Sequence, residues 1–194
     1  MKLSSILVAG ALTATAAVPA FAEEWTIDPT HTIIGFAVDH FGMSAIKGRF
    51  HTYEGEFVLD TENPANSSIN ITIDVASMDT GNGPRDDHFR AADFFEVETF
   101  PEATFTSTSV EITGDTTAEV VGDLTIKGVT KPVTLSVTLN GMLDDHPIVQ
   151  GTQAYAGFTA TTEFERADFG IDTFAGVGDT VSIDIEMEAT GPNS

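Results

Sequence analysis

The 194-residue chain contains no cysteine. Disulfide frameworks, cysteine-based zinc sites and thiol nucleophiles are therefore excluded. Cations are scarce as well, because 8 Lys and Arg stand against 30 Asp and Glu and give a formal net charge of −22. Nucleic acid is bound by clustered cations that release phosphate counterions, so we expect no nucleic-acid partner. An anionic membrane surface would repel the chain for the same reason.

The first 22 residues have the pattern of a secretory signal peptide. Lys2 precedes an apolar stretch that becomes rich in Ala and Thr and ends in Ala20-Phe21-Ala22, an A-x-A cleavage sequence. The stretch is short for a membrane span and contains Pro19, which favours cleavage over a retained anchor. We expect cleavage after Ala22 and a single mature domain over residues 23–194. This domain would be periplasmic or secreted, without stable membrane insertion.

Alternation of apolar and polar residues with a period of two dominates the rest of the chain and predicts strands with one buried face. Only residues 84–95 have a helical composition, so we expect a short helical insert there. Turn signals rich in Gly, Asn and Pro separate the alternating segments. Eight segments have the strand pattern: 34–40, 49–60, 69–75, 103–112, 118–126, 133–139, 155–164 and 181–187.

Eight consecutive antiparallel strands with half-polar faces must either pair two sheets or close on themselves. Closure removes the exposed edges, so we predict an all-β, eight-stranded antiparallel barrel. Such an interior holds either packed side chains or one small ligand, and a filled barrel is the alternative to a pore. The chain has 14 Phe but one Trp and two Tyr, which favours an apolar lumen with few polar groups that need partners.

The densest polar cluster lies in the helical insert. Arg85 and His88 are three residues apart and share a helix face. Three roles are open: contact with a ligand head group at the barrel mouth, an acid/base pair of His88 with a carboxylate, or a network that pins the insert across the barrel end. In the first role, polar contacts come from Arg85, Asp86 and His88, and the start of the ligand tail meets Phe89, Phe94 and Phe95.

The motifs of enzymes and metal sites are missing from the sequence. There is no G-x-S-x-G elbow, phosphate-binding loop or dinucleotide fingerprint. The spacings of His31, His40 and His51 match no local metal-ligand pattern. We therefore expect no enzyme, no metal and no cofactor.

Several motifs, in the same order along the chain, resemble YceI-like domains. They are WTIDPTHT (25–32), FAVDHFG (36–42), KGRF (47–50), SMDTGN (77–82), RDDHF (85–89), GDLTIKGVTKPV (122–133) and RADFGI (166–171). The resemblance implies an extended lipocalin-like barrel, usually periplasmic or secreted. Its pore would hold one long amphiphile such as a polyisoprenoid, an isoprenoid quinone or a fatty acid derivative. A homodimer is compatible with the resemblance.

The resulting hypothesis is a binding or carrier protein for such an amphiphile. The Gly-rich segment 81–93 would open and close the pore. Two alternatives are an exported enzyme that acts on a lipid head group with His88 and Asp86, and a secreted scavenger of amphiphilic toxins and drugs. Positions in alternating apolar sets or in family-matched strands are predicted to form the pore wall: Phe36, Ile71, Ile73, Phe105, Leu124, Leu135, Phe158 and Ile183.

Overall fold

The computed structural model describes residues 22–145, 148 and 153–191, so the predicted signal peptide falls outside the described residues except for Ala22. None of the helices in this part of the chain is long and apolar enough to cross a membrane. The elements are β1 (Glu23–Ile27), β2 (Ile33–His40), β3 (Ser44–Phe50), β4 (Tyr53–Leu59), η1 (Pro64–Asn66), β5 (Ser68–Asp74), η2 (Val75–Ser77), β6 (Met78–Asp79), α1 (Gly83–Arg90), β7 (Glu102–Ile112), β8 (Thr117–Ile126), β9 (Val129–Leu143), β10 (Tyr155–Glu165), η3 (Arg166–Phe169) and β11 (Val177–Thr190).

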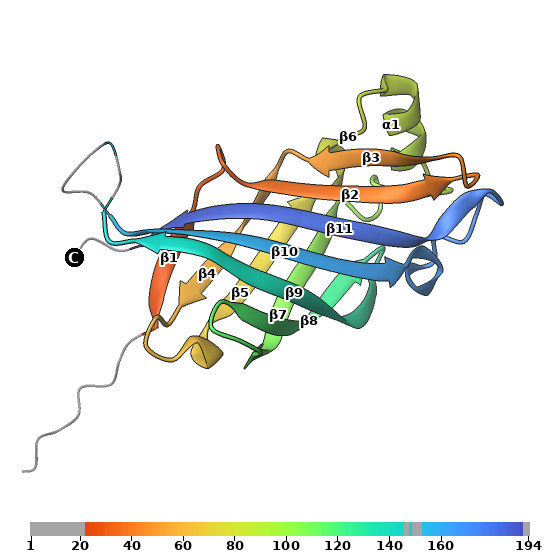
Figure 1. Ribbon diagram of the computed structural model, residues 1–194. Helices are drawn as coiled ribbons and strands as arrows, with labels where there is room; N and C mark the ends of the chain where they lie inside the picture. Colours follow the sequence, from red (N-terminus) through yellow and green to blue (C-terminus); the bar gives the residue numbers. More distant parts are fainter. Residues whose placement is uncertain (1–21, 146–147, 149–152, 192–194) are drawn as a thin grey trace, which may run out of the picture.

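Eight of these strands form a closed antiparallel ring (Figure 1). The order around the ring is β1-β4-β5-β7-β8-β9-β10-β11, and β1 pairs with β11 through Thr26↔Thr190 and Ile27↔Ala189. The predicted all-β, eight-stranded antiparallel barrel is thus confirmed. The same edge of β11 pairs with β2 over a longer stretch, from Val177 to Glu186. β3 then pairs with β2, and β6 pairs with β3.

The strand predicted over residues 49–60 is wrong, because two strands occupy this segment. β3 ends at Phe50 and β4 begins at Tyr53. Between them, the backbone N–H groups of His51 and Thr52 donate hydrogen bonds to the Ser77 hydroxyl at 3.1 and 3.0 Å. This contact turns the chain away from the β3 ladder, so β3 stays beside β2 while β4 enters the ring.

The helical insert exists and is shorter than the predicted 84–95. The Asn82 side chain accepts a hydrogen bond from the Arg85 N–H at 3.1 Å and caps α1 at its N-terminus. Pro84 stands in the first turn, where its missing N–H has no intrahelical partner to lose. The helix ends at Arg90, and Phe94 follows in a turn closed by its N–H bond to the Ala91 carbonyl.

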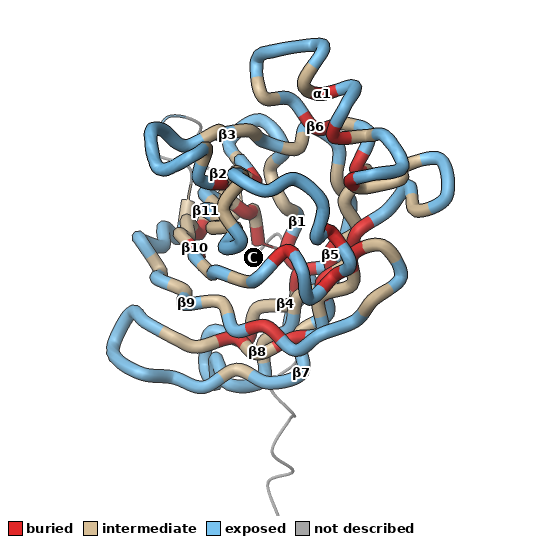
Figure 2. Tube along the Cα trace, turned by 90° about the vertical axis from the view of Figure 1, so that its right-hand side faces the viewer, coloured by how far each residue is buried: buried red, intermediate tan, exposed pale blue. Residues whose placement is uncertain are grey.

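The apolar faces of the strands pack in two clusters inside the barrel. One cluster closes the end that carries α1 and η3, which faces the viewer in Figure 2. Its core comprises Val75, Met78, Phe89, Phe94, Ala103, Ile126, Phe169 and Ile171. The other cluster lies near the opposite end, and its buried members are Trp25, Phe57, Ala156 and Ala189. We call the first end the plugged end.

Candidate ligand-binding pore

Two cavities lie in line inside the barrel. The inner cavity, at the plugged end, has a volume of about 180 Å³. The outer cavity, toward the opposite end, has a volume of about 230 Å³. Both are lined by Ile69, Leu135, Ile185 and Met187, which form a waist where the cavities meet. The two cavities therefore adjoin inside the barrel, and we call the pair the passage.

The inner cavity lies deep in the barrel. Every residue that lines it is buried or half-buried. Four of these residues carry polar side-chain groups, namely Thr32, Tyr53, Thr162 and Arg166, and the others are aliphatic or aromatic. This interior suits a hydrocarbon tail, because it offers a large apolar surface and few groups that would be left without a hydrogen bond.

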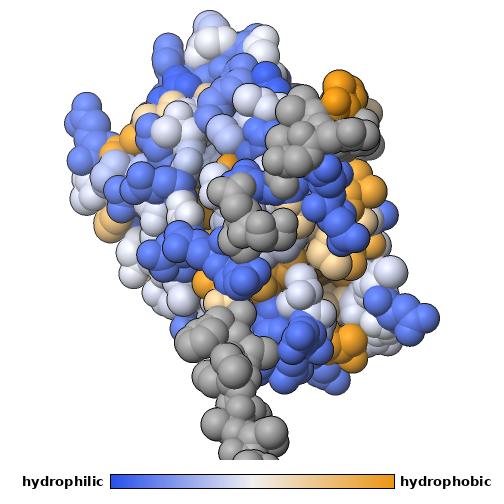
Figure 3. Space-filling view, turned by 90° about the vertical axis from the view of Figure 1, so that its left-hand side faces the viewer, coloured by the Kyte–Doolittle hydropathy of each residue, from blue (hydrophilic) through white to orange (hydrophobic). Residues whose placement is uncertain are grey.

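The outer cavity reaches the surface at the end opposite to α1, which we call the entrance (left-hand end in Figure 1). Its lining includes exposed residues of two loops, the β4–β5 loop and the β7–β8 turn. The space-filling view onto this end shows a largely hydrophilic surface with separate hydrophobic patches (Figure 3). The exposed lining residues are Thr61, Pro64, Ser68, Ile112, Gly114, Asp115, Thr116, Thr117 and Met142.

Local hydrogen bonds hold the β4–β5 loop in shape. The buried Asp60 carboxylate accepts the backbone N–H groups of Glu62 and Asn63 at 3.1 and 2.7 Å, and the Asn66 amide at 3.0 Å. The Asn66 and Asn63 hydrogen bonds hold the pKa of Asp60 below its ordinary value, because they favour the charged form. The loop therefore presents a preformed rim with an ionised carboxylate inside it.

The β7–β8 turn is braced in a similar way. The N–H groups of Thr113 and Gly114 both donate to the Thr117 carbonyl, at 2.9 and 3.2 Å. The Thr116 carbonyl accepts the N–H of Leu139 on β9 at 2.8 Å. The second rim element is thus fixed to the barrel wall.

The structure places all eight predicted wall residues on the passage. Phe158 lines the outer cavity, Leu135 lines both cavities, and the other six line the inner one. Strand alternation carries this information, because every second side chain of a strand points to the same face of its sheet. Contact between these residues and a ligand stays a prediction. Sequence reasoning missed the polar wall residues Thr32, which precedes β2, and Tyr53, which begins β4.

The six residues predicted at the mouth separate into two groups. Phe89, Phe94 and Phe95 line the inner cavity, and the first two are buried in the plug. Arg85, Asp86 and His88 line neither cavity. The segment predicted to gate the pore therefore packs as a plug across the closed end.

Arg85 and Asp86 both hold Thr80. The Arg85 guanidinium donates from Nε to the Thr80 hydroxyl at 2.7 Å and from an Nη to the Thr80 carbonyl at 2.8 Å. The buried Asp86 carboxylate accepts the Thr80 N–H at 3.0 Å and also the Thr80 hydroxyl. These contacts fasten the loop between β6 and α1.

The exposed His88 lies on the outside of the plug. Its Nε2 is 3.1 Å from a carboxylate oxygen of Asp93, and its ring makes edge contacts with Phe94 and Phe174 at centroid distances of 5.0 and 4.9 Å. An imidazole in this position stabilises the packing around α1. It does not face the passage.

Arg166 is the one cation among the residues that line the two cavities, and its donors are occupied. The buried guanidinium donates to the carbonyls of Ile171 at 2.6 Å, Thr173 at 2.8 Å and Gly178 at 2.9 Å. Further bonds reach the Asp179 carboxylate at 3.2 Å and the carbonyls of two other residues. Arg166 therefore fixes the loop before β11 and has no donor left for a ligand.

One group of side chains outside the passage carries atoms that could act as metal ligands. Single ligand atoms of Asp28, His31 and Glu188 lie within 4.8 Å of one another. His31 Nδ1 is 2.7 Å from Asp28, which also accepts the N–H and the hydroxyl of Thr30. Partial burial raises the pKa of Asp28, but these hydrogen bonds outweigh burial and hold it at about 2. The same pairing raises the pKa of His31.

A closed eight-stranded antiparallel barrel of this kind is a lipocalin-like fold. Within this class, the model of the YceI-like domain matches residues 25–189. The chain belongs to the YceI-like family, which confirms the resemblance found in the sequence motifs.

Curated relatives match the chain over most of its length. A UPF0312 protein of Vibrio vulnificus is 41% identical over 193 residues, which are 98% of each chain. Protein YceI of Escherichia coli is 42% identical over 159 residues, which are 81% of each chain.

Solved structures share the fold. BcnA of Burkholderia cenocepacia matches with a TM-score of 0.75 and 27% identity, over 84% of this chain and 99% of BcnA. A polyisoprenoid binding domain from Saccharophagus degradans matches with a TM-score of 0.65, over 89% of this chain and all of that domain. At 16% identity the second match is a likeness of fold alone.

Proposed function

We propose that the protein is an exported carrier that holds one long amphiphile, such as a polyisoprenoid or an isoprenoid quinone, in its barrel. The observation that carries the proposal is the pair of adjoining apolar cavities, one behind the plug at α1 and one that reaches the surface at the entrance. Family membership and the polyisoprenoid-binding fold neighbour support it. The signal-like first 22 residues support export to the periplasm.

The shape of the passage favours a linear tail over a compact ligand. Two cavities in line, joined at the waist of Ile69, Leu135, Ile185 and Met187, admit a chain that passes from one to the other. Burial of a hydrocarbon yields about 0.8 kcal/mol per methylene before ordering losses. A tail that fills both cavities therefore gains more binding free energy than a tail that stops at the waist.

The chemistry of the lining supports binding without catalysis. Among the residues that line the inner cavity, the hydroxyls of Thr32, Tyr53 and Thr162 and the saturated Arg166 include no pair of nucleophile and base. The nearest candidate pair, His88 with Asp93, faces solvent outside the plug. The alternatives of a head-group enzyme and a toxin scavenger have no observation of their own in their favour.

Lipid extraction tests the proposal. The protein is purified from the exported fraction of its native cells, extracted with organic solvent and analysed by mass spectrometry. We expect one class of long-chain lipid, at about one molecule per chain. Extracts that hold only traces of mixed membrane lipids contradict a dedicated carrier.

A pair of variants on β11 provides the matched control. Ile183 lines the inner cavity, while its neighbour Ser182 donates a hydrogen bond to the Ala37 carbonyl. Ile183→Glu puts a charge into the passage and should remove the lipid, whereas Ser182→Glu should retain it. Circular dichroism verifies that both variants fold, and Ile183→Gln replaces the first variant if it does not.

A further inference from the structure

The seven Lys and Arg residues that follow the predicted signal peptide lie away from the entrance. They are Lys47, Arg49, Arg85, Arg90, Lys127, Lys131 and Arg166, on or next to β3, α1, the β8–β9 turn and η3. The described segments that form the entrance end comprise residues 22–25, 59–69, 110–118, 139–145, 153–156 and 188–191. These segments contain no Lys or Arg.

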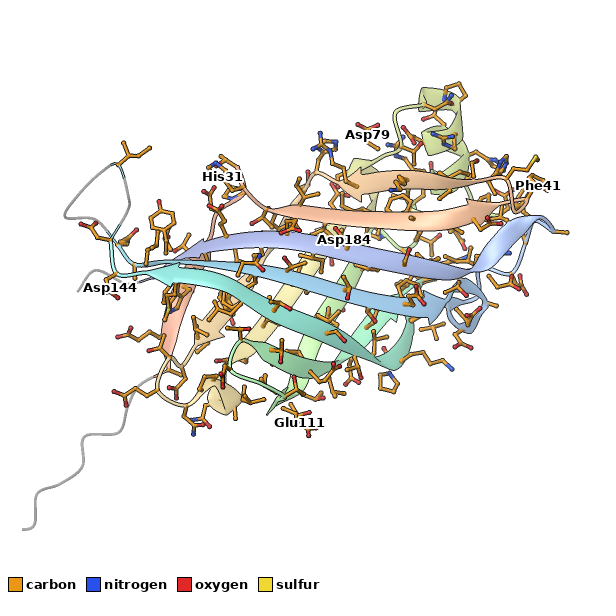
Figure 4. All side chains as sticks on the ribbon, in the orientation of Figure 1. His31, Phe41, Asp79, Glu111, Asp144 and Asp184 are labelled. Carbon is orange, nitrogen blue, oxygen red and sulfur yellow. The ribbon has the colours of Figure 1, made fainter. Side chains whose placement is uncertain are left out.

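Carboxylates surround the opening instead. Asp115 lines the outer cavity in the β7–β8 turn, and the exposed Glu62 lies in the β4–β5 loop next to the buried Asp60. Figure 4 shows Asp144 at this end of the barrel, beyond the end of β9, and Glu111 is the residue before the last one of β7, next to the β7–β8 turn. An anionic head group at the opening would meet only charges of its own sign on these residues.

Uncharged hydrogen-bonding groups stand at the same place. The hydroxyl residues in the lining of the outer cavity are Thr61, Ser67, Ser68, Thr116 and Thr117. Hydroxyls both donate and accept, so they suit the carbonyl or hydroxyl oxygens of a neutral head group. Cleavage after Ala22 would leave an α-amino group at this end, but it would sit beside the carboxylates of Glu23 and Glu24.

Inside the plugged end, the described residues of the inner cavity offer no alternative place for an anion. The Arg166 guanidinium is surrounded by carbonyls and Asp179, and the Arg85 guanidinium is bonded to Thr80 outside the cavity lining. The remaining wall of the inner cavity is apolar apart from three hydroxyls. A charged head group buried there would lose its hydration without gaining a partner.

We propose that the bound amphiphile carries an uncharged head group, which stays at the entrance among the rim hydroxyls while the tail fills the passage. Isoprenoid alcohols and quinones belong to this class, and prenyl phosphates and diphosphates are selected against. The proposal rests on the carrier function proposed above and narrows the class of its ligand. Its physical basis is the absence of Lys and Arg from the described entrance segments, where carboxylates and hydroxyls surround the opening.

Two lipids with the same tail isolate the effect of head-group charge. The protein is incubated with equal amounts of geranylgeraniol and geranylgeranyl diphosphate, recovered by gel filtration, and both lipids are quantified by mass spectrometry. At low ionic strength we expect the alcohol to be retained at least about tenfold better, a difference of about 1.4 kcal/mol. The preference should shrink several-fold near 1 M salt, where charges on the rim are screened beyond about 3 Å.

A pair of double variants separates a local from a global charge effect. Glu62→Lys with Asp115→Lys reverses two charges at the entrance and should bring the two lipids to within about threefold of each other. Glu98→Lys with Glu102→Lys changes the net charge equally, but Glu102 begins β7 at the plugged end and both side chains are exposed. The second double variant should keep the preference for the alcohol.

Three results would overturn the inference. Equal or stronger retention of the diphosphate by the natural protein contradicts it directly and leaves the carrier function intact. An equal loss of preference in both double variants assigns the effect to net charge and removes the role of the rim. Retention of neither lipid removes the proposed function and this inference together.

Discussion

Leu135 is the position where one substitution tests the passage as a continuous path. It lines both cavities from β9 and contributes to the waist between them. Leu135→Trp should narrow the waist and exclude a tail from the inner cavity. That cavity of about 180 Å³ has room for at least about six groups of the volume of a liquid water molecule, about 30 Å³ each.

The expected loss of affinity follows from this volume. Six methylenes at about 0.8 kcal/mol each correspond to about 5 kcal/mol, and part of this is offset because the shortened tail loses less freedom. A loss of about a thousandfold in affinity, or about 4 kcal/mol, is the reasonable expectation. Overpacking of the wall should lower the free energy of unfolding by about 1–3 kcal/mol.

Titration calorimetry with geranylgeraniol measures the affinity, and urea unfolding verifies the fold. Leu135→Met, which conserves the volume of the side chain, is the matched control and should bind within about threefold of the natural protein. A folded Leu135→Trp variant with unchanged affinity would refute the reasoning, because the tail would then not pass the waist.

Three further predictions concern packing, pH and the plug. In Gly122→Ala the new methyl group would meet the Phe105 ring and lie 2.7 Å from the Thr106 carbonyl oxygen, so urea unfolding should show a loss of about 1–3 kcal/mol. The Asp28 carboxyl has a pKa of about 2, below the usual 3.9 of unfolded chains, so its stabilising effect is present above about pH 4 and lost toward pH 2. In Asp28→Asn the free energy of unfolding should depend less on pH between about pH 4 and pH 2. An unchanged dependence on pH in this variant would show that the Asp28 carboxyl is not its source. Arg85→Ala should lower the melting temperature by a few degrees and leave the extracted lipid unchanged, and a drop in lipid without a change in melting would restore the head-group role considered from the sequence.

Sequence periodicity predicts most of the barrel and fails where tertiary contacts interrupt it. The segment 49–60 alternates without a visible break, yet the Ser77 hydroxyl divides it by binding the N–H groups of His51 and Thr52. β1 has five residues with only Trp25 buried, which is too short for a periodic signal. Nothing in the local sequence shows that β1 rather than β2 closes the ring, because the two strands share the edge of β11.

In the candidate site, too, the sequence predicts the features that depend on local pattern and misses those that depend on tertiary packing. Inward positions such as Phe36 and Ile183 follow from strand alternation, which is a local property. The position of the opening depends on which loops leave the barrel end uncovered, and that is decided by packing far apart in the chain. The cluster around Arg85 has the composition of a binding site, and its use as a clamp on Thr80 becomes visible only in three dimensions.

A crystal structure of the protein purified with its native lipid tests the central claim most directly. We predict one continuous tube of electron density that starts at the rim hydroxyls near Thr117, passes the waist at Leu135 and ends in the inner cavity against Phe94. Side chains that fill the passage, or a ligand head group bound at the α1 end, would contradict it.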